Sequence, residues 1–316
     1  MLDRHYCEID FLGDLKQAIN RYNNVYYKYE TEYIEAIMHI IRDDIFTHST
    51  EKPSESGLPE NIVKIKVKDI RKSRGFKVNK YSTLLRCVAE LGYLNPQFNL
   101  LFRGQGRDHG NTKYGSTIYP SIFYDEFKEK RKELFKNLDE NHEMLESNQK
   151  KISLHKENIP SRKAILSYPE FYYSLLEHYE FNKTQLINLT QSLRVAATFA
   201  LLKGASGYVF IFGMPHPHGS ISHFIDQDMV LVKLQNVCPP DAKRPHYQEG
   251  YLVGNFPFMR SRRTGDNLAR RLIGKYQIDN LDGGFWDSNF ERVHKKVLYP
   301  DIDPFLNRLD KILGKE

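Results

Sequence analysis

Apolar and polar positions along the chain change between helical and extended spacing. Residues 1–46 repeat apolar side chains every three or four positions, which predicts two helices. Residues 48–61 are rich in Ser, Pro and Gly and predict a loop. From Ser82 to Gly92 a third helix is expected, because Ser is a common N-cap and Gly a common residue after a last turn.

Short apolar runs predict strands in the middle of the chain. They are QFNLLFRGQ, VFIF, MVLVKLQNV and YLVGNFPF. VKIKVKDI alternates valine and isoleucine with lysine, which fits a short strand or an exposed edge equally well. Late helices are expected in DNLARRLIGKYQI and DPFLNRLDKIL. Because strands and helices mix without regular alternation, we predict an α+β fold.

A charged segment interrupts this pattern at residues 126–158, which contain no Gly or Pro. Leu138, Leu145 and Ile152 lie seven residues apart and give one thin apolar seam. We predict an inserted helix or helical hairpin over residues 126–163. A coiled coil that binds a protein partner is the other interpretation of the seam.

Composition fits a globular protein: 316 residues, 40% hydrophobic and 27% charged. We expect an N-terminal helical region over residues 1–60 and one α+β domain over residues 61–316. Cys7, Cys87 and Cys238 are few and far apart, so neither a disulfide framework nor a thiolate zinc site is expected. With no signal-like or membrane-spanning run, a cytoplasmic protein without membrane contact is expected.

The net charge and the motifs present or absent limit the classes of function that fit this chain. The net charge of +6 suits an anionic small ligand but does not by itself require nucleic acid. Basic runs at residues 71–80 and 260–271 keep nucleic-acid binding as an alternative. The chain lacks a P-loop, HExxH, CxxC and GxSxG. His216, His218 and His223 surround two prolines and are expected in a solvated loop, so we expect no metal.

Arg103 is the first candidate for chemistry, because it follows an apolar strand and precedes two glycines in LFRGQG. Its planar guanidinium fits two oxygens of a phosphate or carboxylate. The neighbouring glycines would leave open backbone as the floor of a cleft. An internal salt bridge is the structural alternative for this arginine.

Four motifs in chain order resemble the FRG-domain family, named for Phe-Arg-Gly. They are FRGQ at residues 102–105, YPS at 119–121, HYEFNKTQLIN at 178–188 with the alanine-rich helix after it, and QEGYL at 248–252. The chain differs from the family pattern at Gln185, Asn188 and Glu249. The resemblance covers residues 98–255.

The same order is similar to ADP-ribosyltransferases of the arginine, Ser-Thr-Ser, glutamate type. This resemblance implies an ADP-ribosyltransferase-like, mixed and mainly antiparallel sheet, NAD as substrate, and a toxin or defence role. It implies catalytic roles for Arg103, Ser192 and Glu249, where Glu249 would stabilise an oxocarbenium-like ribose. The remaining residues implied to contact NAD are Gly104, Gln105, Tyr179, Thr190, Gln248 and Tyr251.

Several of these candidate residues have an alternative interpretation in which they only stabilise the fold. Thr190 and Ser192 suit caps of the following helix, His178 and Tyr179 suit a packed helix end, and Glu249 suits a surface turn. A nucleotide- or anion-binding module without catalysis would need Arg103 but not the carboxylate. The acceptor of a transferred group is not identified by the sequence.

Overall fold

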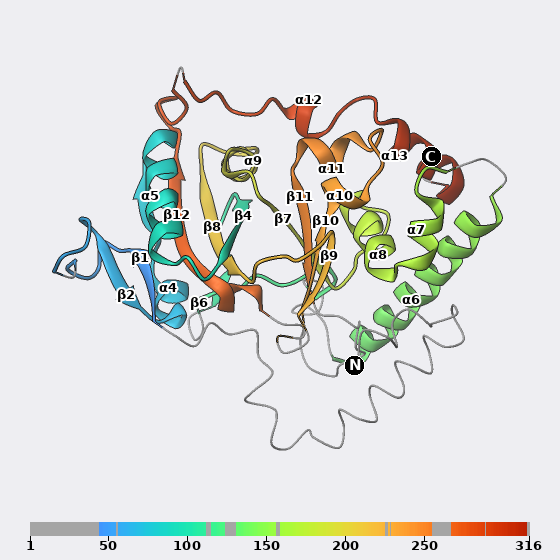
Figure 1. Cartoon of the computed structure of the whole chain (residues 1–316), viewed down its shortest axis with the longest axis horizontal. Helices are drawn as coiled ribbons and strands as arrows, with labels where there is room; N and C mark the ends of the chain where they lie inside the picture. Colours follow the sequence, from blue (N-terminus) through green and yellow to red (C-terminus); the bar gives the residue numbers. More distant parts are fainter. Residues whose placement is uncertain are drawn as a thin grey trace.

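The computed structural model describes most of the chain after Asp44. The described residues are 44–54, 56–111, 115–123, 131–155, 159–224, 227, 229–254, 267–287 and 289–314. They form an α+β structure with an eight-stranded sheet (Figure 1), which confirms the predicted α+β class. The helices expected before residue 44 lie outside the described residues.

The strands and helices are as follows. The strands are β1 (Ile45–His48), β2 (Ile62–Ile65), β3 (Phe76–Val78), β4 (Asn99–Gln105), β5 (Gly110–Asn111), β6 (Gly115–Ser116), β7 (Leu186–Thr190), β8 (Ser206–Met214), β9 (Ile221–Phe224), β10 (Met229–Lys233), β11 (Gly250–Gly254) and β12 (Leu272–Asp279). The α-helices are α4 (Val67–Lys72), α5 (Tyr81–Leu94), α6 (Arg131–Leu154), α7 (Arg162–Ser167), α8 (Pro169–His178), α9 (Leu193–Ala200), α10 (Leu234–Val237), α11 (Lys243–Tyr247), α12 (Lys295–Leu298) and α13 (Pro304–Leu313), with 3-10 turns η1 (Ser121–Phe123) and η4 (Leu268–Arg271).

The large sheet has the order β3-β12-β8-β4-β7-β11-β10-β9. Only β12 and β3 are parallel neighbours among these pairs, so the sheet is mixed and mainly antiparallel. β4 pairs with β8 along its whole length, whereas it meets β7 at a single register pair, Phe102 with Thr190. The middle of the sheet is therefore joined weakly between β4 and β7.

Three helices cover one face of this sheet. A side chain added at Gly274 would meet Leu91 of α5, and one added at Gly104 would overlap the backbone of α9. One added at Gly250 would meet His178 of α8 at 3.3 Å. The registers place these three glycines on the same face, because paired residues share a face and alternate residues return to it.

Over Arg131–Leu154 the charged insertion forms helix α6, as predicted, and this helix packs on its own chain. Leu145 and Ile152 are buried in a core that also holds Phe305 and Leu309 of α13. The hydroxyl of Tyr172 on α8 donates to the carbonyl oxygen of Leu145 at 2.6 Å. This part of the apolar seam is therefore used inside the molecule and is not exposed to a separate partner.

Several elements differ from the sequence-based expectation. Residues 45–48 form a strand paired with β2, where a helix was expected to reach residue 46. Residues 67–72 form helix α4, and α5 begins before Ser82 and continues past Gly92. The expected late helix at residues 266–278 is wrong over its C-terminal half, which is strand β12. That strand lies between β3 and β8, and its first five residues are buried on both faces, so its apolar residues there do not alternate with exposed ones.

Candidate functional site

The motifs that drew attention in the sequence meet where β4 and β7 separate. Arg103 extends from β4, and its Nη1 donates to the carbonyl oxygen of Asn188 on β7 at 2.6 Å. The guanidinium thus bridges two strands that share only one register pair. We call the residues gathered here, Arg103, Ser121, Glu177, His178, Thr184 and Asn188, the β4–β7 polar cluster.

Glu177 at the end of α8 ties three segments of this cluster together. Its Oε1 accepts from the Ser121 hydroxyl at 3.1 Å, and its Oε2 accepts from the Thr184 backbone N–H at 2.6 Å. Burial raises the pKa of Glu177 to about 7, although the hydrogen bonds from Thr184 and Ser121 and the charge of Arg103 act in the opposite direction. A carboxyl group poised near neutral pH suits proton transfer as well as anchoring.

His178 lies beside Glu177 but has a different environment. Its Nδ1 is 2.9 Å from Oδ1 of Asn188, and burial, assisted by the charge of Arg244, lowers its pKa to about 3. The imidazole is therefore neutral at physiological pH. The expectation that His178 packs at a helix end is confirmed, because the whole side chain is buried.

Strand register places Arg103 in a row of side chains on the sheet face opposite α9. Lys233, Tyr251 and Leu189 are successive partners on β10, β11 and β7. Because Phe102 pairs with Thr190, Leu189 neighbours Arg103, whose other neighbours in the row are Phe210 on β8 and Lys275 on β12. The row therefore carries three cations on one face of the sheet.

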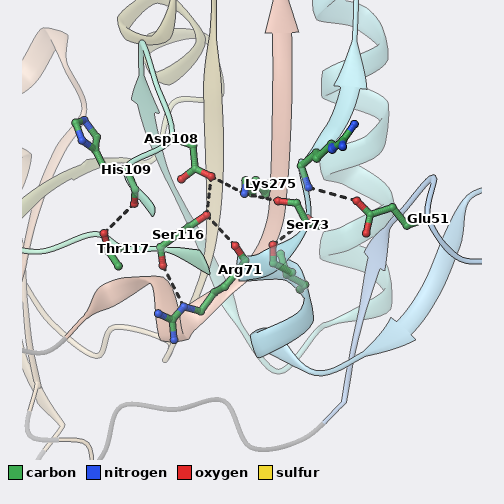
Figure 2. Close-up of polar contacts among 10 residues, drawn as sticks. Glu51, Arg71, Ser73, Asp108, His109, Ser116, Thr117 and Lys275 are labelled. Atoms are coloured by element: carbon green, nitrogen blue, oxygen red, sulfur yellow. Dashed lines mark hydrogen bonds and ion pairs between the residues drawn. The ribbon is translucent and has the colours of Figure 1, made fainter. Parts of the chain in front are cut away.

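The two lysines of this row are engaged differently. Lys275 contacts an oxygen of Asp108 at 2.6 Å and donates to the Ser73 carbonyl at 2.5 Å (Figure 2). Asp108 also accepts from Ser116, which links this end of the row to the β5–β6 turn. Lys233 lies 6.0 Å from the ring centre of Tyr251. Lys275 is therefore paired with a carboxylate inside the fold.

Glu249 lies on the same face as Arg103, one row further along. It adjoins β11, two positions before Tyr251, and its Oε2 accepts from Nε2 of Gln191 at 3.4 Å. The same Nε2 donates to Oε1 of Gln235 at 3.0 Å, and Tyr251 donates to the other end of Gln191. Glu249 has a left-handed backbone, φ 48°, at the entry to the strand. It is half-buried in a polar network rather than free at a surface turn.

Thr190, Ser192 and Gln248 hold the β7–β11 end in place. Thr190 donates from its hydroxyl to the Gln248 carbonyl at 2.7 Å and accepts from the Ser192 backbone N–H. Ser192 is the N-cap of α9, with its hydroxyl accepting from Val195 N–H. Gln248 donates from its side chain to the Leu298 carbonyl at 2.8 Å. The capping role is thus confirmed for Ser192, and all three residues make structural contacts.

The other expected ligand residues do not form one pocket. Tyr179 is buried in the core that α8 forms with α6 and α13, where its hydroxyl donates to Asp303 at 3.1 Å. The open cleft floor expected at Gly104 is wrong, because the backbone of α9 fills that space. Gln105 does lie on the face of Arg103, and its buried Oε1 accepts no hydrogen bond from the described residues.

One surface pocket in the described structure lies away from Arg103. It is lined by residues of β1, β2, α4 and β3, by the loops that follow β1 and α4, and by Lys275. The expected histidine loop makes no shared site either: His216 lies near the Pro96 carbonyl, His218 packs on Phe224, and His223 contacts Glu170 at 3.0 Å. That last contact corrects the view that all three histidines are simply solvated.

Sequence reasoning missed Glu177, Ser121 and Asn188 as site residues. All three lie in or beside the motifs quoted for the FRG resemblance, which was the signal available.

In the described residues, no helix combines the length and apolar character needed to cross a membrane. No family model, no curated protein and no solved structure matches this chain. The likeness to FRG domains and ADP-ribosyltransferases therefore stays a resemblance carried by the motifs.

Proposed function

We propose that this domain binds NAD, or a closely related dinucleotide, across the sheet face that carries Arg103 and Glu249, and cleaves its bond to nicotinamide. The observation that supports this is the strand register, which gives a guanidinium and a carboxylate the same face on strands separated only by β7. Neighbouring strands lie about 4.8 Å apart, so the two side chains can approach opposite ends of one nucleotide.

In this proposal each group has a separate task. Arg103 pairs with a phosphate, with Lys233 as a second cation on the same row. Glu249, positioned by Gln191, stabilises the positive charge that develops on the ribose as nicotinamide leaves. Tyr251 orients Gln191 through its hydroxyl. Ser192 and Thr190 act as positioning residues, because their hydroxyls hold the start of α9 and the Gln248 backbone.

The test measures nicotinamide release from NAD labelled in that ring, with a bacterial lysate as the source of acceptors. Glu249→Gln removes the charge at nearly constant size, and we expect its rate to fall about 10²- to 10³-fold. Glu60→Gln, at an exposed position, is the matched control and should keep the rate. Equal rates in wild type and Glu249→Gln, or no release in any condition, would reject the catalytic proposal.

A second candidate is a binding module without catalysis. It is favoured by the contacts that already engage both groups: Arg103 with the Asn188 carbonyl and Glu249 with Gln191. In that case NAD raises the unfolding temperature in proportion to its affinity while no nicotinamide appears. Arg103→Gln should abolish the shift, and Arg74→Ala at an exposed position should leave it unchanged.

A further inference from the structure

A histidine, a cysteine and a glutamate meet between the β1–β2 hairpin and α5. His48 ends β1, and Cys87 and Glu90 lie on α5. One ligand atom of each residue lies within 4.8 Å of the others. Sequence motifs could not reveal this group, because 39 positions separate the histidine from the cysteine. None of the three residues belongs to the β4–β7 polar cluster or to the row of Arg103.

The local geometry suits one small cation. Cys87 and Glu90 are three residues apart on a helix, so their side chains leave the same face. His48 Nε2 is 2.9 Å from Oε2 of Glu90, and the side chain of Glu90 is 30% exposed. In a tetrahedral zinc site, bond lengths of about 2.0–2.3 Å set the ligand atoms roughly 3.4–3.6 Å apart. To reach that spacing, the 2.9 Å separation of His48 and Glu90 has to widen, and any separation near the 4.8 Å limit has to close by roughly 1 Å.

The second nitrogen of His48 has the partner that a metal-bound histidine requires. Nδ1 lies 2.9 Å from the hydroxyl of Tyr276, which is fully buried on β12. When Nε2 binds a metal, Nδ1 carries the proton, and the tyrosine oxygen can accept it. Such outer contacts fix the tautomer and ring orientation of metal-binding histidines. The position of Glu90 at the rim offers a path for the ion from solvent.

We propose that His48 Nε2, Cys87 Sγ and a carboxylate oxygen of Glu90 bind a zinc-class divalent cation that fastens the β1–β2 hairpin to α5. The donor set of nitrogen, sulfur and oxygen is one that zinc accepts, and the thiolate and carboxylate together balance its two charges. Binding displaces the thiol proton of Cys87 to solvent. Water completes the fourth position on the exposed side of Glu90.

Cobalt substitution tests this site directly, because a thiolate ligand gives Co²⁺ a charge-transfer absorption in the near ultraviolet. We use the full chain in a Cys7→Ser background, so that only Cys87 and Cys238 remain as thiols. One equivalent of Co²⁺ should produce the band, and Zn²⁺ should abolish it by displacement. Cys87→Ser should remove the band, whereas Cys238→Ser, the other buried cysteine, should retain it.

Two gentler variants keep the test decisive if Cys87→Ser does not fold. Tyr276→Phe removes only the contact to Nδ1 and should weaken Co²⁺ binding about 10- to 100-fold. Glu90→Gln should weaken it at least as much, while Glu60→Gln should leave it unchanged. The proposal is overturned if no band forms, if the band persists in Cys87→Ser, or if Tyr276→Phe and Glu90→Gln both bind Co²⁺ as wild type does.

Discussion

Arg103 and Gly104 are neighbours on β4, but their side-chain positions meet opposite faces of the sheet. Arg103 reaches toward β7 and the Asn188 carbonyl, whereas Gly104 allows the backbone of α9 to approach the strand. The Phe-Arg-Gly motif therefore combines a cation for one face with a close helix contact on the other. The sequence indicated the importance of both residues, but not that the glycine serves packing.

Replacing Gly104 by alanine should destabilise the fold strongly. The new Cβ would overlap the Ala196 carbonyl oxygen and lie near the Ala200 backbone N–H, and backbone cannot move aside as a flexible side chain can. We expect a loss of about 2–3 kcal/mol or more in the free energy of unfolding, measured by urea denaturation. Gly106→Ala is the control, because its Cβ would meet the Ala200 carbonyl at 3.9 Å. Similar losses in both variants would contradict this explanation.

The polar partners of Arg103 show where residue-level prediction ends. One hydrogen bond of Arg103 goes to a backbone carbonyl 85 positions later, a kind of partner that the sequence analysis did not consider. Any residue can supply a carbonyl, so no side-chain pattern marks Asn188 as the acceptor. The charge of Arg103 also acts on Glu177, whose pKa it lowers against the larger effect of burial, and Glu177 has no motif of its own.

At the scale of elements, continuous apolar runs predicted several internal strands, and helical spacing predicted the amphipathic helices. β4, β8, β10, β11, α6 and α13 were all anticipated from apolar runs or helical spacing. β12 was mistaken for a helix because its buried Lys275 makes the strand look amphipathic. The lysine is accommodated by Asp108 and the Ser73 carbonyl, which come from other segments. Tertiary contacts of that kind override local pattern.

Helix α6 provides a prediction at this scale. Leu145→Ala should lower the free energy of unfolding by about 2–4 kcal/mol, because the leucine is 5% exposed and fills a core with α8 and α13. Leu154→Ala, at the end of the same helix where the leucine is 70% exposed, should change it by less than about 0.5 kcal/mol. Urea denaturation of both variants makes the comparison. If the two substitutions cost the same, the seam does not pack as described.

At the scale of the whole molecule, pH should act through Glu177. Its carboxyl has a folded pKa of about 7 against an ordinary value of 4.5, so the folded state binds the proton more tightly than the unfolded state. Stability from this group is complete below about pH 4.5, falls as pH rises toward 7, and is level above it. Burial disfavours the charged carboxylate, so ionisation of Glu177 as the pH rises toward neutral lowers the stability of the fold.

Glu177→Gln tests this linkage by removing the titrating proton. Relative to the variant, wild type should lose of the order of 1–3 kcal/mol of stability between about pH 5 and about pH 8. The amide oxygen can still accept from Thr184 N–H, while the amide group donates to Ser121. Chemical denaturation across that pH range measures the difference, with Glu60→Gln as the exposed control. Parallel stability curves for wild type and Glu177→Gln would show that Glu177 does not titrate as inferred.

The placement of β12 governs when the sheet can be completed as the chain leaves the ribosome. β12 lies between β3 and β8, although it follows both by many residues and ends at Asp279. Until that segment emerges, the facing edges of β3 and β8 present unpaired backbone groups. These groups can form hydrogen bonds with strands of other nascent chains. A chain that stalls or is truncated before residue 272 should therefore be aggregation-prone and depend on chaperones. This holds whatever the stability of the finished domain.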